Sequence, residues 1–89
     1  MPATIVQQRV RDYPTWKKEF DDIKDMRLAS GAYADQVYRD EDDPYKVTFI
    51  LKWNSLANAK KYFSSPELIG SMSRGGVEGQ SNIAYVNEG

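Results

Sequence analysis

The chain has 89 residues, of which 40% are hydrophobic and 28% charged, with a formal net charge of −1 and neither cysteine nor histidine. This composition predicts a single globular domain over residues 1–89, with no general attraction to nucleic acid or anionic lipid. Without Cys and His the chain cannot build disulfides, Cys-based zinc sites, histidine-ligated haem or a Ser–His–Asp triad, so we expect no cofactor and no metal. Neither a signal peptide nor a membrane-spanning stretch is visible, so we expect a cytoplasmic protein without a membrane partner.

A strand and an amphipathic helix are predicted in the first third of the chain. The segment TIVQQRV, residues 4–10, is rich in β-branched side chains, and its alternate residues share one face. The next segment, residues 12–31, places its apolar side chains at helical spacing. We expect Asp12 to cap this helix, Pro14 to occupy its first turn and Gly31 to end it.

Arg27 interrupts the apolar stripe of this helix. It continues the spacing set by Trp16, Phe20 and Ile23 instead of lying on the charged face. A buried guanidinium is costly unless it is paired. Two interpretations remain open. In the first, the side chain reaches the surface or binds helix C-terminal carbonyls or a carboxylate. In the second, it faces a pocket and orients a carboxylate, phenolate or enolate of a ligand.

A β-hairpin is predicted next, from strands over residues 32–40 and 46–53. The second strand, KVTFILKW, alternates apolar and polar side chains as a half-buried strand does. The connection EDDPY has the aspartates and the proline that favour turns. The acidic run Asp40 to Asp43 lacks the glycine and the distal glutamate of a calcium-binding loop, so we interpret it as a turn.

A second helix and a final strand complete the predicted elements. The helix is expected to begin near Asn54–Ser55 and to carry Leu56, Ala59 and Phe63 on one face. The helix restarts at SSPEL, where Ser65 suits the N-cap and Pro66 the first helical position. The glycine-rich segment SMSRGGVEGQ then precedes a strand over residues 81–88. A phosphate-binding loop has the opposite context, with a strand before it and a helix after it. We therefore expect Gly75 to end the helix in the left-handed conformation, with the later glycines easing the path to the strand.

The order of elements is typical of an α+β fold of the ferredoxin-like βαββαβ type. In that fold a four-stranded antiparallel sheet carries two helices on one face. Ile50 and several tyrosines are then expected on the other face, which would be exposed to water in a monomer. A second copy of the chain is the simplest cover for such a face, so we predict a homodimer formed through the sheet.

Nearly the whole chain resembles the small dimeric α+β-barrel proteins, through the segments YPTWKKEFD, RLASGA, VYRDEDDPYKV, LKWNSLANAKKYFSSPEL and GSMSRGGVEG. These proteins include the antibiotic biosynthesis monooxygenase-like proteins and their cyclase-like relatives. The resemblance implies two ferredoxin-like subunits with their sheets packed face to face, each with a ligand pocket between its sheet and its helices. It implies a cofactor-independent monooxygenase or cyclase acting on a small aromatic or polyketide-like compound. The alternative is a non-catalytic ligand-binding or structural dimer.

The candidate pocket residues are large apolar side chains at helix and strand spacings, together with one arginine. They are Trp16, Phe20, Arg27, Phe49, Trp53, Phe63 and Met72. Such side chains line ligand pockets, and they also form ordinary cores. Tyr33, Tyr38 and Tyr85 could add hydroxyls to a pocket or to a dimer interface. No catalytic residue is assigned, because no Tyr, Asp or Glu falls clearly on an apolar face.

Metal and nucleic-acid sites are disfavoured by the residues around their candidates. Asp21, Asp22 and Asp25 are surrounded by Lys17, Lys18 and Lys24, which is typical of a solvated ion-pair face. RNA-recognition motifs share the predicted topology, but the chain lacks their K/R-G-F/Y signature and a stacking aromatic in the first strand. We therefore expect a small organic ligand and no nucleic-acid partner.

Overall fold

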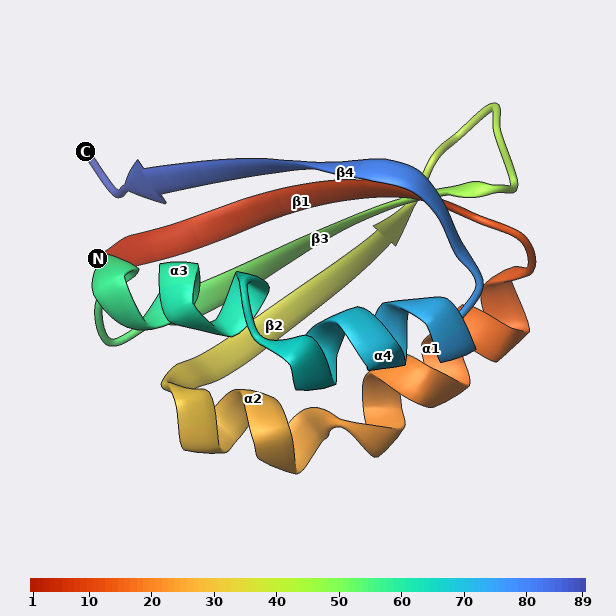
Figure 1. Cartoon of the computed structure of the whole chain (residues 1–89). Helices are drawn as coiled ribbons and strands as arrows, with labels where there is room; N and C mark the ends of the chain where they lie inside the picture. Colours follow the sequence, from red (N-terminus) through yellow and green to blue (C-terminus); the bar gives the residue numbers. More distant parts are fainter.

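The computed structural model describes residues 1–89 and contains four strands and four helices. In chain order they are β1 (Pro2–Val10), α1 (Tyr13–Asp22), α2 (Lys24–Ser30), β2 (Ala32–Arg39), β3 (Lys46–Trp53), α3 (Leu56–Phe63), α4 (Pro66–Arg74) and β4 (Val77–Asn87). The strands form one antiparallel sheet in the order β2-β3-β1-β4, and the helices lie on one face of it (Figure 1). The predicted ferredoxin-like fold is confirmed. No helix is both long enough and apolar enough to cross a lipid bilayer.

The two predicted helical segments are each divided into two helices. The prediction of one continuous helix over residues 12–31 was wrong, because the chain leaves helical geometry at Ile23, with φ −98° and ψ 16°. The apolar spacing continues across this break, so the sequence pattern does not reveal it. The predicted ends are confirmed: the Asp12 carboxylate accepts a hydrogen bond from the Thr15 backbone N–H, and Gly31 ends α2 at φ 110°. Ser65 likewise caps α4.

The core lies between the sheet and the helices. Along β1 and β3 every second side chain is buried, because successive side chains of a strand point to opposite faces. The buried apolar residues are Val6, Val10, Trp16, Phe20, Ala32, Val47, Phe49, Leu51, Trp53, Ala59, Tyr62 and Leu68. The strands therefore present one apolar face to the helices and leave the opposite face uncovered.

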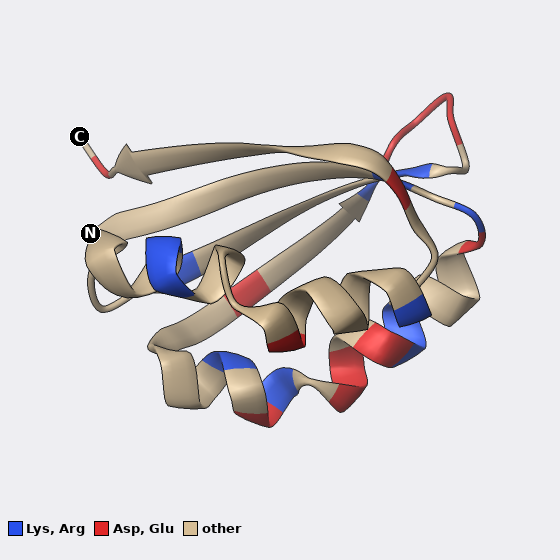
Figure 2. Ribbon diagram, viewed as in Figure 1, with Lys and Arg blue, Asp and Glu red and all other residues tan.

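The uncovered face of the sheet has an uncharged centre. One cross-strand row places Ile5 beside both Ile50 and Ala84, and Gln36 completes it at the edge. The neighbouring row consists of Tyr38, Thr48, Gln7 and Asn82. Charged residues lie mainly on the helices and in the loops, whereas the middles of the strands carry few (Figure 2). Exposed fractions of 37% for Ile5 and 51% for Tyr38 show that large apolar side chains reach solvent here.

The predicted position of the tyrosines on this face is correct only for Tyr38. Tyr85 pairs with inward-facing Thr4, and its ring meets that of Phe63 from α3 at 6.3 Å. Tyr33 lies where the pairing of β2 with β3 shifts register, beside the exposed edge of the sheet. A register shift moves side chains between faces, and the sequence alternation alone does not show it.

The glycine-rich segment is a turn between α4 and β4, as its context predicted. The assignment of the left-handed residue to Gly75 was wrong, because Gly75 keeps helical geometry at φ −78°. Gly76 and Gly79 adopt positive φ instead, at 76° and 69°. The Gly76 carbonyl accepts a hydrogen bond from the Arg11 backbone N–H at 2.9 Å, so the chain reverses where α4 meets the end of β1.

The acidic segments have the structural roles predicted for them. The Asp40 carboxylate accepts hydrogen bonds from the backbone N–H groups of Asp42 and Asp43, which closes the hairpin turn. On α1, exposed lysines pair with aspartates one turn later, as in the Lys18–Asp22 pair at 3.0 Å. No group of three or more His, Cys, Asp or Glu residues is arranged to hold a metal ion.

Candidate functional site

A small cavity lies between the inner face of the sheet and the four helices. Its volume is about 30 Å³, which accommodates about two water molecules. Six of the seven candidate residues line it: Trp16, Phe20, Arg27, Phe49, Phe63 and Met72. The remaining lining residues are Gln8, Glu19, Ile23, Tyr62, Leu68, Ser71, Gly75 and Val77. Neither Tyr33, Tyr38 nor Tyr85 reaches the cavity.

Trp53 lies outside the lining and belongs to the core. Its side chain is fully buried, and its indole Nε1 donates a hydrogen bond to Thr4 Oγ1 at 2.9 Å. Its ring packs against those of Tyr62 and Phe63 from α3. Tyr62 and Phe63 line the cavity, whereas Trp53 behind them does not.

Aromatic rings form one wall of the cavity. Trp16 and Phe20 are one helical turn apart on α1, and their rings stack at 4.9 Å with an angle of 25°. Phe49, on β3, meets Phe20 edge-on at 5.3 Å. The Trp16 indole Nε1 donates a hydrogen bond to the Gln8 carboxamide oxygen at 3.0 Å. This bond fixes the orientation of the Gln8 carboxamide, so that its oxygen is the acceptor and its Nε2 remains a donor.

Arg27 is buried, and it has structural partners as well as a place on the cavity wall. Its Nη1 donates a hydrogen bond to the Phe20 carbonyl at 2.5 Å, in the last turn of α1, and its guanidinium lies 3.6 Å from the centre of the Phe20 ring. Nη2 is 3.7 Å from an Asp35 carboxylate oxygen on β2. Burial lowers the pKa of Arg27, an effect that nearby Tyr62 and Asp35 oppose. The structural interpretation of Arg27 is therefore confirmed, while its role toward a ligand stays a prediction.

Tyr62 places a hydroxyl beside Arg27. It lies three residues after buried Ala59 on α3, so the same helical face carries both into the interior. Burial raises the pKa of Tyr62 to about 12, although the Arg27 charge partly opposes this shift. At neutral pH the phenol is therefore protonated and can donate a hydrogen bond into the cavity. The sequence analysis missed Tyr62, although its spacing from Ala59 was visible.

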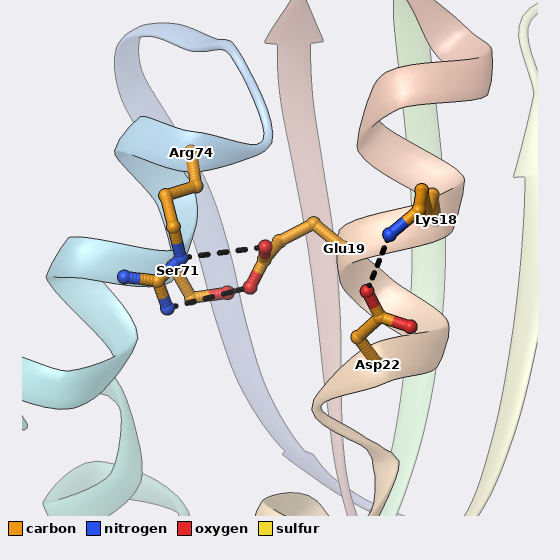
Figure 3. Close-up of polar contacts among 5 residues, drawn as sticks. All are labelled: Lys18, Glu19, Asp22, Ser71 and Arg74. Atoms are coloured by element: carbon orange, nitrogen blue, oxygen red, sulfur yellow. Dashed lines mark hydrogen bonds and ion pairs between the residues drawn. The ribbon is translucent and has the colours of Figure 1, made fainter.

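Glu19 on α1 and Ser71 on α4 bring a carboxylate and a hydroxyl to the part of the cavity lined by these two helices. Ser71 Oγ donates a hydrogen bond to Glu19 Oε2 at 2.7 Å, and Arg74 Nε and Nη2 each lie 3.4 Å from a Glu19 oxygen (Figure 3). Ser71 is 2% exposed. The sequence analysis also missed Glu19. This residue precedes Phe20 and lies four residues before Ile23, at the edge of the apolar stripe. At such an edge the spacing does not determine whether a side chain points inward or outward.

Comparison with known proteins identifies the fold. No protein-family model matches the sequence, and no curated protein sequence matches it. Solved structures match over nearly the whole chain. An antibiotic biosynthesis monooxygenase-like protein from Bordetella bronchiseptica aligns with a TM-score of 0.83 and 10% identity, over 98% of this chain and 95% of that one. A second such protein, from Caulobacter crescentus, aligns with a TM-score of 0.75 and 14% identity, over 98% and 88% of the two chains.

A third match is SnoaB, a cofactor-independent oxygenase from Streptomyces nogalater, with a TM-score of 0.74 and 12% identity over 98% and 91% of the two chains. The protein is thus an α+β protein with a ferredoxin-like fold. More narrowly, its fold is that of the antibiotic biosynthesis monooxygenase-like proteins, and the resemblance drawn from the sequence segments is confirmed at this level.

Proposed function

We propose that the protein binds a small aromatic or polyketide-like molecule in the cavity between its sheet and its helices. The observation that carries this proposal is the set of polar groups buried among the aromatic walls: Gln8, Arg27 and Tyr62. Burying such groups costs free energy that an apolar core avoids. Ligand pockets, in contrast, are typically aromatic surfaces with a few polar groups that fix orientation.

The cavity must open to receive a ligand. Its volume of about 30 Å³ is far below the roughly 300–1,000 Å³ of ordinary ligand pockets. Phe63 and Met72 line it and are only partly buried, so their side chains can move without disrupting the fully buried core. Beyond Tyr62 lies an open groove of about 370 Å³ between α2 and α3. Tyr62 lines both spaces, which supports this side as the route of entry.

We propose a cofactor-independent monooxygenase or cyclase as the activity. The fold shared with a cofactor-independent oxygenase supports this class. Without a cofactor, the protein's own side chains must orient the substrate and stabilise charge as it develops. In this proposal Arg27 and protonated Tyr62, which both line the cavity, are the donors that stabilise an enolate or phenolate oxygen. The second candidate function is a non-catalytic dimer. The small volume of the closed cavity favours it if no ligand opens the cavity.

We also propose a homodimer that covers the outer face of the sheet. The uncharged centre of that face, where Ile5 pairs with Ile50 and where Ile5 and Tyr38 are exposed, supports this arrangement. A chain of this length buries a smaller share of its surface than larger domains do, so association adds apolar burial that the monomer lacks.

Native mass spectrometry of freshly purified protein tests both proposals in one measurement. We expect an ion of twice the 10.2 kDa subunit mass that carries a co-purified small molecule, released when the collision energy rises. A dimer that never carries or acquires a small aromatic molecule would support the non-catalytic dimer. A monomer at micromolar concentration would contradict the proposed interface.

A further inference from the structure

We propose that Glu19 determines which ligands the cavity accepts, by receiving a hydrogen bond from an O–H or N–H group of the ligand. This inference rests on the proposed ligand-binding function and goes beyond it by assigning one end of the ligand a donor group. The expected ligand therefore has an acceptor oxygen at one end of an aromatic ring and a hydrogen-bond donor at the other.

Glu19 is the only carboxylate in the lining of the cavity. An ionised carboxylate can accept about four hydrogen bonds. The Ser71 hydroxyl at 2.7 Å occupies one of these positions, while the two contacts from Arg74 are long, at 3.4 Å each. Glu19 lines the cavity and its side chain is 18% exposed, so the carboxylate keeps acceptor capacity beyond these contacts.

Three other polar groups of the cavity, on Arg27, Tyr62 and Gln8, are available as donors. The Arg27 guanidinium can only donate. The Tyr62 phenol stays protonated because burial raises its pKa to about 12. The Gln8 carboxamide oxygen is already occupied by the Trp16 indole, which leaves Gln8 Nε2 as a donor. A ligand made only of acceptors would satisfy these three groups, but it would bring no donor to the Glu19 carboxylate and would leave it with less water around it.

A purely structural role for Glu19, as a link between α1 and α4, explains less. Glutamine at this position would accept the same hydrogen bond from Ser71 and would be cheaper to bury. The contact with Arg74, whose side chain is 64% exposed, resembles surface ion pairs that contribute little to stability. The packing of α1 against α4 therefore does not require a negative charge at residue 19.

The two tryptophans make ligand binding measurable residue by residue. The Trp16 indole N–H lies in the cavity wall, whereas that of Trp53 is bonded to Thr4 in the core. In ¹⁵N-labelled protein these two indole signals separate binding in the cavity from general effects. The probes are para-hydroxyacetophenone and para-methoxyacetophenone, at a pH where the phenol is neutral. They share a ring and a carbonyl, and they differ in having or lacking the O–H donor.

We expect para-hydroxyacetophenone to shift the Trp16 indole signal and to bind about tenfold more tightly than the methoxy compound, as a hydrogen bond to a charged group implies. Glu19→Gln should reduce this preference to about threefold or less. Asp22→Asn is the matched control, because it removes one negative charge from the same helix at an exposed residue paired with Lys18 (Figure 3). It should leave the preference unchanged.

The possible failures are distinguishable. If both probes shift Trp16 equally in the wild-type protein, or if Glu19→Gln keeps the full preference, the inference is wrong while the proposed binding site stands. If neither probe moves the Trp16 signal at millimolar concentration, the proposed function and the inference both fail. The comparison of the two probes on the wild-type protein requires no variant, so the test holds even if Glu19→Gln folds poorly.

Discussion

Replacement of Arg27 by methionine tests the account of the buried guanidinium most directly. Methionine keeps most of the bulk of the stem and removes the charge and all the donors. Two contacts are lost with it: the hydrogen bond to the Phe20 carbonyl at 2.5 Å and the stacking of the guanidinium at 3.6 Å from the Phe20 ring centre. The Phe20 carbonyl belongs to the last turn of α1, where helix carbonyls lack the usual backbone donors.

The sum of these contributions predicts a net loss of stability. A buried hydrogen bond from a charged donor contributes about 1.5–3 kcal/mol, and a desolvated cation–π contact adds about 1–2 kcal/mol. Removal of the buried charge offsets part of this loss of stability. The free-energy cost of burying the guanidinium, which also lowers the pKa of Arg27, is no longer incurred. The pair with Asp35 is long at 3.7 Å, and Asp35 is 35% exposed, so its loss adds less than about 1 kcal/mol. We expect a net destabilisation of about 1–3 kcal/mol, a decrease in Tm of roughly 5–20 °C.

The assay is thermal unfolding at one fixed protein concentration, because association makes Tm depend on concentration. Lys24→Met is the matched control on the same helix: Lys24 is exposed, and its replacement should change stability by less than about 0.5 kcal/mol. Arg27→Lys keeps the positive charge but replaces the planar guanidinium, with its several fixed donors, by a single ammonium group. The stability of this variant should therefore fall between those of wild type and Arg27→Met. An Arg27→Met protein as stable as wild type, or more stable, would refute the structural role assigned to these contacts.

Further outcomes are expected from four other measurements. Ile50→Glu places a charge at the centre of the outer sheet face; if the proposed dimer forms through this face, sedimentation should show the wild type at twice the 10.2 kDa subunit mass and the variant at 10.2 kDa, at the same concentration. Hydrogen bonds from the Thr15 side chain and backbone lower the pKa of Asp12 below 3.8, so its stabilising contribution is present above about pH 4 and lost as the pH falls through the lowered value. Asp12→Asn keeps the cap and should lose less stability on acidification in melts recorded across this range. Gly76→Ala should cost about 1–2 kcal/mol in chemical denaturation because φ is 76°, whereas Gly75→Ala, at φ −78°, should cost less. Elemental analysis of dialysed protein should find no stoichiometric zinc, copper or iron, because the chain has no Cys or His to bind them.

The sequence determined the order and the ends of most elements, because these depend on residues close together in the chain. Alternation over residues 46–53 predicted β3 to the residue, and Asp12, Gly31 and Ser65 marked helix ends that the structure confirms. Apolar spacing also selected six side chains of the cavity wall, since residues on one helical or strand face point to the same side.

The tertiary structure decided what depends on how distant elements meet. The hydrogen bond between Glu19 and Ser71 joins residues 52 positions apart, and neither position stands out by local spacing. The left-handed residue is Gly76 and not Gly75 because the turn must bring the Gly76 carbonyl to the N–H of Arg11 at the end of β1. Trp53 and Trp16 are equally apolar in the sequence, yet only Trp16 borders the cavity, because α3 covers the end of β3 and leaves open the space beside α1 and α4. Such outcomes depend on the packing of whole helices against the sheet, which no local pattern encodes.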